Sequence, residues 1–226
     1  MLQNLQLETY EQLSLREAVF GALRRGILRG EIPEGEHLTE IAISRQLGVS
    51  RTPVREALDM LVDAGLADKD KFRGAVVSPT DQARARELLE VMAVLECLAA
   101  ERFCSAADPD LKKKQLSRLW EAAQAFERQC ILEEAGTGRD VPDVLALAEM
   151  DETFHMVLIG ASGSRALQET ADALKEQLLR CRVLLIRQDA AGITKHIYDH
   201  HLLLQMLEKG QAKEAAQLMR RHAVLK

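Results

Sequence analysis

The sequence predicts a mainly α-helical protein made of a small N-terminal module and a larger all-helical bundle. Leu, Ala, Glu, Gln and Arg are abundant and aromatic residues make up only 4% of the 226 residues, a composition that favours helices. Apolar residues recur every three or four positions along most of the chain, and strand-like segments are confined to residues 66–78. Because Pro79 ends that region, we expect one domain at 1–78 and a second at 79–226.

The N-terminal module is expected to contain three helices and a hairpin. The first helix spans about 13–29, and Gly30 ends it. Thr39 can cap a short second helix that ends at Leu47, and the third helix runs from Ser50 to about residue 64. Two short strand-like pieces around residues 72–74 indicate a hairpin.

The C-terminal region reads as six helices separated by short breaks rich in glycine or proline. No strand signal, repeat or low-complexity tract interrupts them. The expected helices are 81–104, 109–135, 142–161, 164–189, 193–208 and 211–225.

Composition excludes some classes of protein and leaves others open. No run of about 18 uncharged apolar residues exists to span a membrane, and the first ten residues do not resemble a signal peptide. The net charge of −5 argues against indiscriminate nucleic-acid binding but allows a local basic surface. The four cysteines lack CxxC spacing and are expected to be reduced, as in a cytoplasmic protein: Cys97, Cys104, Cys130 and Cys181.

The second and third helices meet at a tight turn, Gly48-Val49, which is the pattern of a helix-turn-helix. The N-terminus of the third helix can lead into a DNA major groove. Arg51 and Arg55 lie four residues apart on one helix face and can reach base edges or phosphates together. The alternative is that both arginines are ordinary solvated charges. The turn, the Thr52-Pro53 helix start and the basic hairpin at residues 69–73 all favour the DNA-binding interpretation.

The N-terminal sequence resembles the GntR family of winged-helix regulators, most specifically in the run Val49–Leu58, VSRTPVREAL. The resemblance also covers residues 23–30, 38–40 and the wing at 73–74, and it implies a winged helix-turn-helix. Ile41 stands where some members carry an arginine that touches DNA. The residues that the resemblance implies as DNA contacts are Ser50, Arg51, Thr52, Arg55, Arg73 and Gly74.

Acidic and imidazole side chains in the bundle have the spacing of a metal site. Asp151 and His155 are one helical turn apart, and His200 and His222 lie at similar distances on either side of Gly210. If the last two helices form an antiparallel hairpin, these two histidines can meet. A single helical histidine is more often a core or surface residue, and His196 and His201 compete for the same role.

The bundle is similar to the FCD effector domain through its Asp-x3-His element and through two histidines 22 residues apart near the C-terminus. The acidic-His pair Asp199-His200 then selects His200 over His201. The resemblance implies an effector pocket with a divalent ion, Zn or else Ni or Mn, on four ligands: Asp151, His155, His200 and His222.

The effector that the resemblance implies is a small organic acid or similar metabolite, such as a carboxylate. FCD domains often carry an arginine for it in the first helix, where this chain has Met92. The residues that could supply the missing charge are Arg180, Arg182 and Arg187.

Taken together, these patterns predict a ligand-responsive transcription repressor that binds a near-palindromic double-stranded DNA operator as a homodimer. One candidate dimer surface is the helix at 81–104, through Leu88, Leu89, Val91, Leu95 and Ala99. The main alternative is a metal-dependent hydrolase that uses the Asp/His3 site, and a weaker one is a protein–protein scaffold. The hydrolase lacks a convincing general base, because Glu152 is expected to point away from the Asp151/His155 face.

Overall fold

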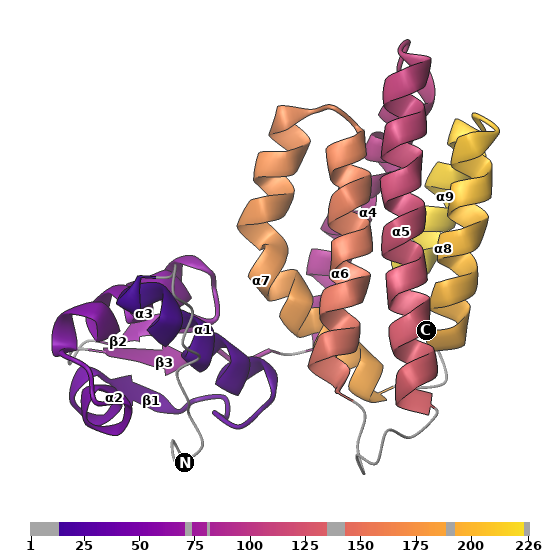
Figure 1. Ribbon diagram of the computed structural model, residues 1–226. Coiled ribbons are helices and arrows are strands. Elements are labelled where there is room, and N and C mark those ends of the chain that lie inside the picture. Colours follow the sequence, from indigo (N-terminus) through magenta and orange to yellow (C-terminus); the bar gives the residue numbers. More distant parts are fainter. Residues whose placement is uncertain (1–13, 71–73, 81, 135–142, 189–192, 224–226) are drawn as a thin grey trace. The chain divides into compact units, whose positions relative to one another are not determined.

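The computed structural model describes the chain outside residues 1–13, 71–73, 81, 135–142, 189–192 and 224–226 (Figure 1). The chain divides into two compact units, Met1–Asp81 and Gln82–Lys226. The sequence had suggested a boundary after residue 78. The expected fold class is confirmed, because the described residues form many helices and a single small sheet.

The N-terminal unit is a three-helix module with a three-stranded antiparallel sheet in the order β1-β3-β2. Strand β1 was not predicted, because three residues are too short to show an alternating pattern. Its residue Thr39 pairs with Gly74, the first residue of β3. The elements are α1 (Leu15–Leu28), β1 (His37–Thr39), α2 (Glu40–Leu47), α3 (Arg51–Asp63), β2 (Ala67–Asp70) and β3 (Gly74–Val77).

Local signals set the ends of these helices. Ser14 and Glu17 form a capping box at the start of α1, and the Thr39 hydroxyl accepts a hydrogen bond from the Ala42 amide at the start of α2. Gly48 ends α2 with a φ of +67°, a conformation that favours glycine. This turn sets the direction in which α3 leaves. The core of the unit consists of fully buried side chains such as Leu23, Ile43, Val54, Leu61 and Val77.

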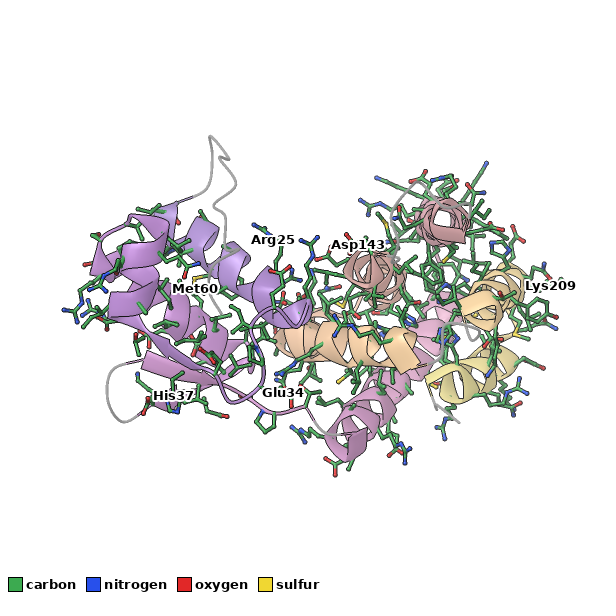
Figure 2. All side chains as sticks on the ribbon, turned by 90° about the horizontal axis from the view of Figure 1, so that it is seen from below. Arg25, Glu34, His37, Met60, Asp143 and Lys209 are labelled. Carbon is green, nitrogen blue, oxygen red and sulfur yellow. The ribbon has the colours of Figure 1, made fainter. Side chains whose placement is uncertain are left out.

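The C-terminal unit is a bundle in which α4 packs against α6, α7 and α9, while α5 packs against α6 and α8. Figure 2 shows side chains filling the space between these helices. The described bounds lie within two residues of the predicted ones: α4 (Gln82–Ser105), α5 (Pro109–Glu134), α6 (Val144–Ala161), α7 (Arg165–Gln188), α8 (Ile193–Glu208) and α9 (Ala212–Ala223).

The bundle core is mostly apolar, with one group of buried charged and imidazole side chains. Phe126, Phe154 and Leu178 are 2% exposed or less, as expected for a closely packed interior. Cys97, Cys130 and Cys181 are buried free thiols, and the free Cys104 is half-buried. Among the described helices, none combines the length and the apolar character needed to cross a bilayer. Several charged and imidazole side chains are nevertheless buried in this unit, and they mark the candidate site: Glu96, Asp151, Glu152, His155, Arg182, Asp199, His200 and His222.

Candidate metal centre and DNA-binding surface

Three helices bring one aspartate and three histidines to the same place. Asp151 and His155 lie one turn apart on α6, His200 comes from α8 and His222 from α9. The hairpin of α8 and α9 turns at Gly210, whose φ of +69° suits glycine. One donor atom from each residue lies within 4.8 Å of the others, and all four residues are buried. These are the four residues that the sequence singled out.

Most ring nitrogens of this cluster, and one carboxylate oxygen, lack hydrogen-bond partners among the described residues. They are Asp151 Oδ1, the Nε2 atoms of His155, His200 and His222, and the Nδ1 atoms of His155 and His200. A buried polar atom without a partner is costly, so each such atom calls for a ligand. Donors about 2.1 Å from an ion lie at most about 4.2 Å apart in six-coordinate geometry and about 3.4 Å apart in tetrahedral geometry. The cluster therefore fits a divalent ion after its most distant donors close by about 0.6 Å for six-coordinate geometry, and by more for a tetrahedral ion.

Two carboxylates lie beside the Nδ1 atoms of two histidines. Glu96 Oε1 on α4 lies 2.6 Å from His155 Nδ1, an ion-pair contact outside hydrogen-bond geometry, and Asp199 Oδ2 is hydrogen-bonded to His222 Nδ1 at 3.2 Å. Both contacts leave Nε2 to face the cluster, as in carboxylate–histidine–metal arrangements. The ring of Phe154 stacks on His200 with centroids 3.9 Å apart. Sequence reasoning missed Glu96, although a glutamate inside the apolar run 91–100 was a visible signal.

Arg182 of α7 joins the acidic groups of the site. Its Nη1 donates to Asp151 Oδ2 at 2.6 Å, and its Nε donates to Glu152 Oε2 at 2.5 Å. Glu152 is thus buried in an ion pair with Arg182 and is not one of the four clustered residues. Burial alone would raise the pKa of Asp151, but the Arg182 guanidinium reverses this and holds the pKa well below its usual range. Asp151 is therefore a carboxylate.

Burial also decides the charge of the histidines. It lowers the pKa of His155 and His200 well below the usual range, so both rings are neutral near pH 7. A metal ion requires neutral imidazoles, and these need not lose a proton to bind one. In contrast, burial raises the pKa of Glu96 to about 7 despite the attraction of Arg182.

The two competing histidines lie outside the four-residue group. His201 is partly exposed, with its Nε2 3.5 Å from Glu127 Oε2. The ring of His196 lies 4.5 Å from that of His222, and its pKa is lowered to about 4, chiefly by burial. His196 instead lines a small adjoining cavity of about 10 Å³, room for about one water molecule.

Only some of the residues that the sequence suggested for the effector pocket line this cavity. Met92 lines it, and so does Arg182. Arg180 and Arg187 lie on α7 with Arg182, but neither is among the residues that line the cavity. Arg180 is half-buried and Arg187 is exposed. Of the three candidate arginines, Arg182 is therefore the one at the site. Arg180 lies two positions away on the same helix, so its side chain points about 200° from that of Arg182. The described residues that line the cavity are Leu89, Met92, Glu96, His155, Arg182, Leu185, His196 and His222.

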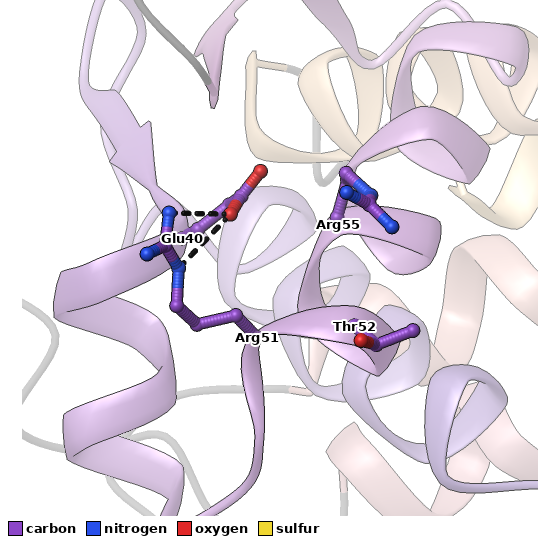
Figure 3. A pocket seen from close by; sticks show the side chains of 4 residues that line it. All are labelled: Glu40, Arg51, Thr52 and Arg55. Atoms are coloured by element: carbon purple, nitrogen blue, oxygen red, sulfur yellow. Dashed lines mark hydrogen bonds and ion pairs between the residues drawn. The ribbon is translucent and has the colours of Figure 1, made fainter.

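The second candidate site is the N-terminus of α3. Ser50, Arg51, Thr52 and Arg55 are all exposed, and the last three line one open pocket with Glu40 of α2 (Figure 3). Arg51 Nε and Nη2 donate to Glu40 Oε2 at 3.2 and 3.0 Å. The arrangement presents an oriented guanidinium and the free amides of a helix start, which suit bases and phosphates.

Nearby residues complete the description of this surface. Sequence reasoning did not identify Glu40 as a partner of Arg51, because the two residues are 11 positions apart on different helices. Ile41, at the position of the missing arginine, is 57% exposed. Gly74 begins β3, and a Cβ there would lie 2.2 Å from the Leu38 carbonyl oxygen. Arg73, the other predicted wing residue, lies outside the described residues.

Comparisons with known proteins assign both units. Residues 15–77 match the family model "Bacterial regulatory proteins, gntR family", and residues 87–224 match the FCD domain. An HTH-type transcriptional regulator of Agrobacterium vitis is 32% identical over 145 residues, covering 64% of this chain and 79% of that protein. The HTH-type transcriptional repressor RspR of Escherichia coli is 25% identical over 209 residues, covering 92% and 85% respectively.

Solved structures agree with this assignment. A GntR-type transcriptional regulator from a Rhodococcus species superposes with a TM-score of 0.71 at 25% identity, covering 93% of this chain and 94% of that one. Escherichia coli McbR/YncC shares the fold with a TM-score of 0.68 at 22% identity, covering 94% of both chains.

Proposed function

Because this chain belongs to the GntR family of bacterial regulatory proteins and carries an FCD domain, we propose that it is a metabolite-responsive repressor with a metal-centred effector site. The family and the relatives are transcription regulators, not enzymes, so the hydrolase alternative is dropped. The single observation that carries the sensing half is the convergence of four buried donors that lack partners among the described residues.

The proposed ion is Zn, with Ni or Mn as alternatives, held by Asp151, His155, His200 and His222. When bound, it would supply a Lewis-acidic centre that attracts an anionic or oxygen-bearing effector. A small organic acid fits this role. Arg182 already contacts three protein carboxylates, so the acid group of the effector would be left to the ion.

The proposed DNA contacts are Ser50, Arg51, Thr52 and Arg55 of the reading helix, with Arg73 and Gly74 at the wing. A repressor role is proposed from the similarity to RspR, which is named a repressor. We propose a cytoplasmic location, because the chromosomal DNA that the protein would bind lies there. The reader is proposed to occupy residues 1–78, and the effector and dimerisation domain residues 79–226.

Sequence selection from random duplex DNA, followed by fluorescence anisotropy on the selected site, tests the DNA half. Substituting Arg51→Ala should weaken binding by about 5- to 150-fold, since a good base contact contributes about 1–3 kcal/mol. The matched control is Lys213→Ala, which removes one exposed positive charge from α9 and should change affinity little. Equal affinities for wild-type and Arg51→Ala protein would contradict the assignment.

A homodimer is proposed because one reading helix covers too few base pairs for genomic specificity. Most of the residues first suggested for the interface are wrong for that role, because Leu88, Leu89 and Ala99 are buried inside the bundle itself. The outward face of α4 instead exposes Val91, Val94 and Leu98 at helical spacing, 45–59% exposed.

We expect this stripe to pair with its copy, and the selected DNA sites to contain two related half-sites. Sedimentation equilibrium should give a dimer for the wild-type chain and a weaker one for Val94→Glu. A monomeric wild-type chain, or a Val94→Glu variant that dimerises equally well, would contradict this surface.

A further inference from the structure

The charged side chains around Arg182 divide the two oxygens of Asp151 between different partners. Oδ2 accepts the hydrogen bond from Arg182 Nη1 at 2.6 Å and lies 3.7 Å from His155 Nε2. Oδ1 finds no hydrogen-bond partner among the described residues and lies 3.4 Å from His200 Nε2. Both oxygens therefore lie near an imidazole, but only Oδ2 is hydrogen-bonded to the guanidinium, and Oδ1 keeps its lone pairs open.

Arg182 is itself held on more than one side. Its Nε donates to Glu152 Oε2 at 2.5 Å, and its Nη2 lies 3.9 Å from Glu96 Oε1. Arg182 and its three acidic neighbours, Asp151, Glu152 and Glu96, are all buried, so water does not compete for these contacts. The planar fork of arginine meets carboxylates at several fixed angles, which a lysine ammonium cannot do. The guanidinium is thus a fixed group that cannot turn away from Asp151 without leaving Glu152 unpaired.

We propose that Arg182 is a positioning residue that restricts Asp151 to a single donor oxygen, so that the bound ion keeps open positions for the effector. This inference rests on the metal centre proposed above. With one carboxylate oxygen and three imidazole nitrogens the chain supplies four donors. An ion that accepts five or six ligands then has one or two positions left. If Oδ2 were released, Asp151 could chelate with both oxygens and fill one of them.

The charge balance at the site supports the same role. Asp151, Glu152 and Glu96 are three buried acidic groups around one guanidinium. Fully ionised, they leave two negative charges, which a divalent ion neutralises. Arg182 therefore offers no net positive charge to the effector, and its contribution is to the geometry of Asp151.

Cobalt(II) titration of the full chain tests the inference, because the visible spectrum of Co(II) reports coordination number and acetate serves as a probe of open positions. Arg182→Lys keeps the charge without the fork. Arg182→Met combined with Glu152→Gln removes a positive and a negative group together, and it protects the test if a lone buried charge prevents folding. Arg180→Met is the control, since Arg180 is half-buried on the same helix and does not line the cavity.

In the wild-type and control proteins, acetate should shift the cobalt spectrum. In both Arg182 variants we expect about 10- to 100-fold weaker cobalt affinity, an altered spectrum before acetate is added, and a smaller acetate response. Variants with the wild-type spectrum and acetate response would overturn the inference. A lower cobalt affinity would not rescue it, because general loosening of the bundle would also lower the affinity. A wild-type chain that binds no cobalt would instead remove the metal centre itself, and this inference with it.

Discussion

Replacing Asp199 by asparagine should weaken metal binding without disturbing the fold. Asp199 Oδ2 lies 3.2 Å from His222 Nδ1, and the residue is 8% exposed. Burial alone would raise the pKa of Asp199, but the hydrogen bond with His222 outweighs it and lowers the pKa, so the group is charged. Asparagine keeps the shape and removes the charge that makes His222 Nε2 a stronger donor.

The expected size of this effect follows from the role of the contact. Loss of a partner that orients a metal-bound histidine costs about 10- to 100-fold in metal affinity, or about 1.4–2.7 kcal/mol. The cost should lie toward the lower end, because the amide oxygen of asparagine can still accept a hydrogen bond from Nδ1.

Zinc affinity measured by competition with a chromophoric chelator provides the assay. The control is Glu127→Gln, which neutralises a carboxylate 3.5 Å from His201 Nε2, outside the four-residue group. Asp199→Asn should bind zinc at least tenfold more weakly than Glu127→Gln does. Affinities within twofold of each other would refute the idea that Asp199 orients a metal-ligating histidine.

Three further outcomes are expected. Gly74→Ala should lower the free energy of unfolding of the N-terminal unit by about 1–3 kcal/mol in urea, because the new Cβ would lie 2.2 Å from Leu38 O; an unchanged midpoint would argue against this close approach. Glu40→Gln should reduce the ratio of specific to non-specific DNA affinity about fivefold in anisotropy titrations, since Arg51 loses its charged partner, and an unchanged ratio would count against that role. Removing the metal with a chelator should destabilise the helical unit by about 4 kcal/mol when the ion was present at about 1,000 times its Kd, and a melting temperature insensitive to chelation would speak against a structural ion.

Much of the fold could be predicted because its signals are local. The apolar spacing in the helices and the glycines at 30, 48, 65 and 210 are each visible within a few residues of sequence. Strand β1 could not be predicted in this way, since its three residues are defined by pairing with β3 and not by a pattern of their own. The same pairing places Gly74 inside the sheet, where the absence of a side chain is required by the Leu38 carbonyl.

The candidate ligands were visible for a similar reason, while the groups around them were not. Asp151 and His155 share a helix face, and the α8–α9 hairpin relates His200 to His222 through a single turn. The contact of Arg182 with Asp151 spans 31 residues and joins two helices. Choosing Arg182 over Arg180 requires the rotation of α7 against α6, which helical periodicity alone does not provide.

The metal content of the purified full-length chain tests the metal centre most directly. Elemental analysis after dialysis against a trace of zinc should find one divalent ion per wild-type chain. It should find far less than one in Asp151→Ala and His200→Ala, each of which removes one of the four donors. A wild-type chain without a stoichiometric ion, or variants that keep the full content, would contradict a metal-centred regulatory site.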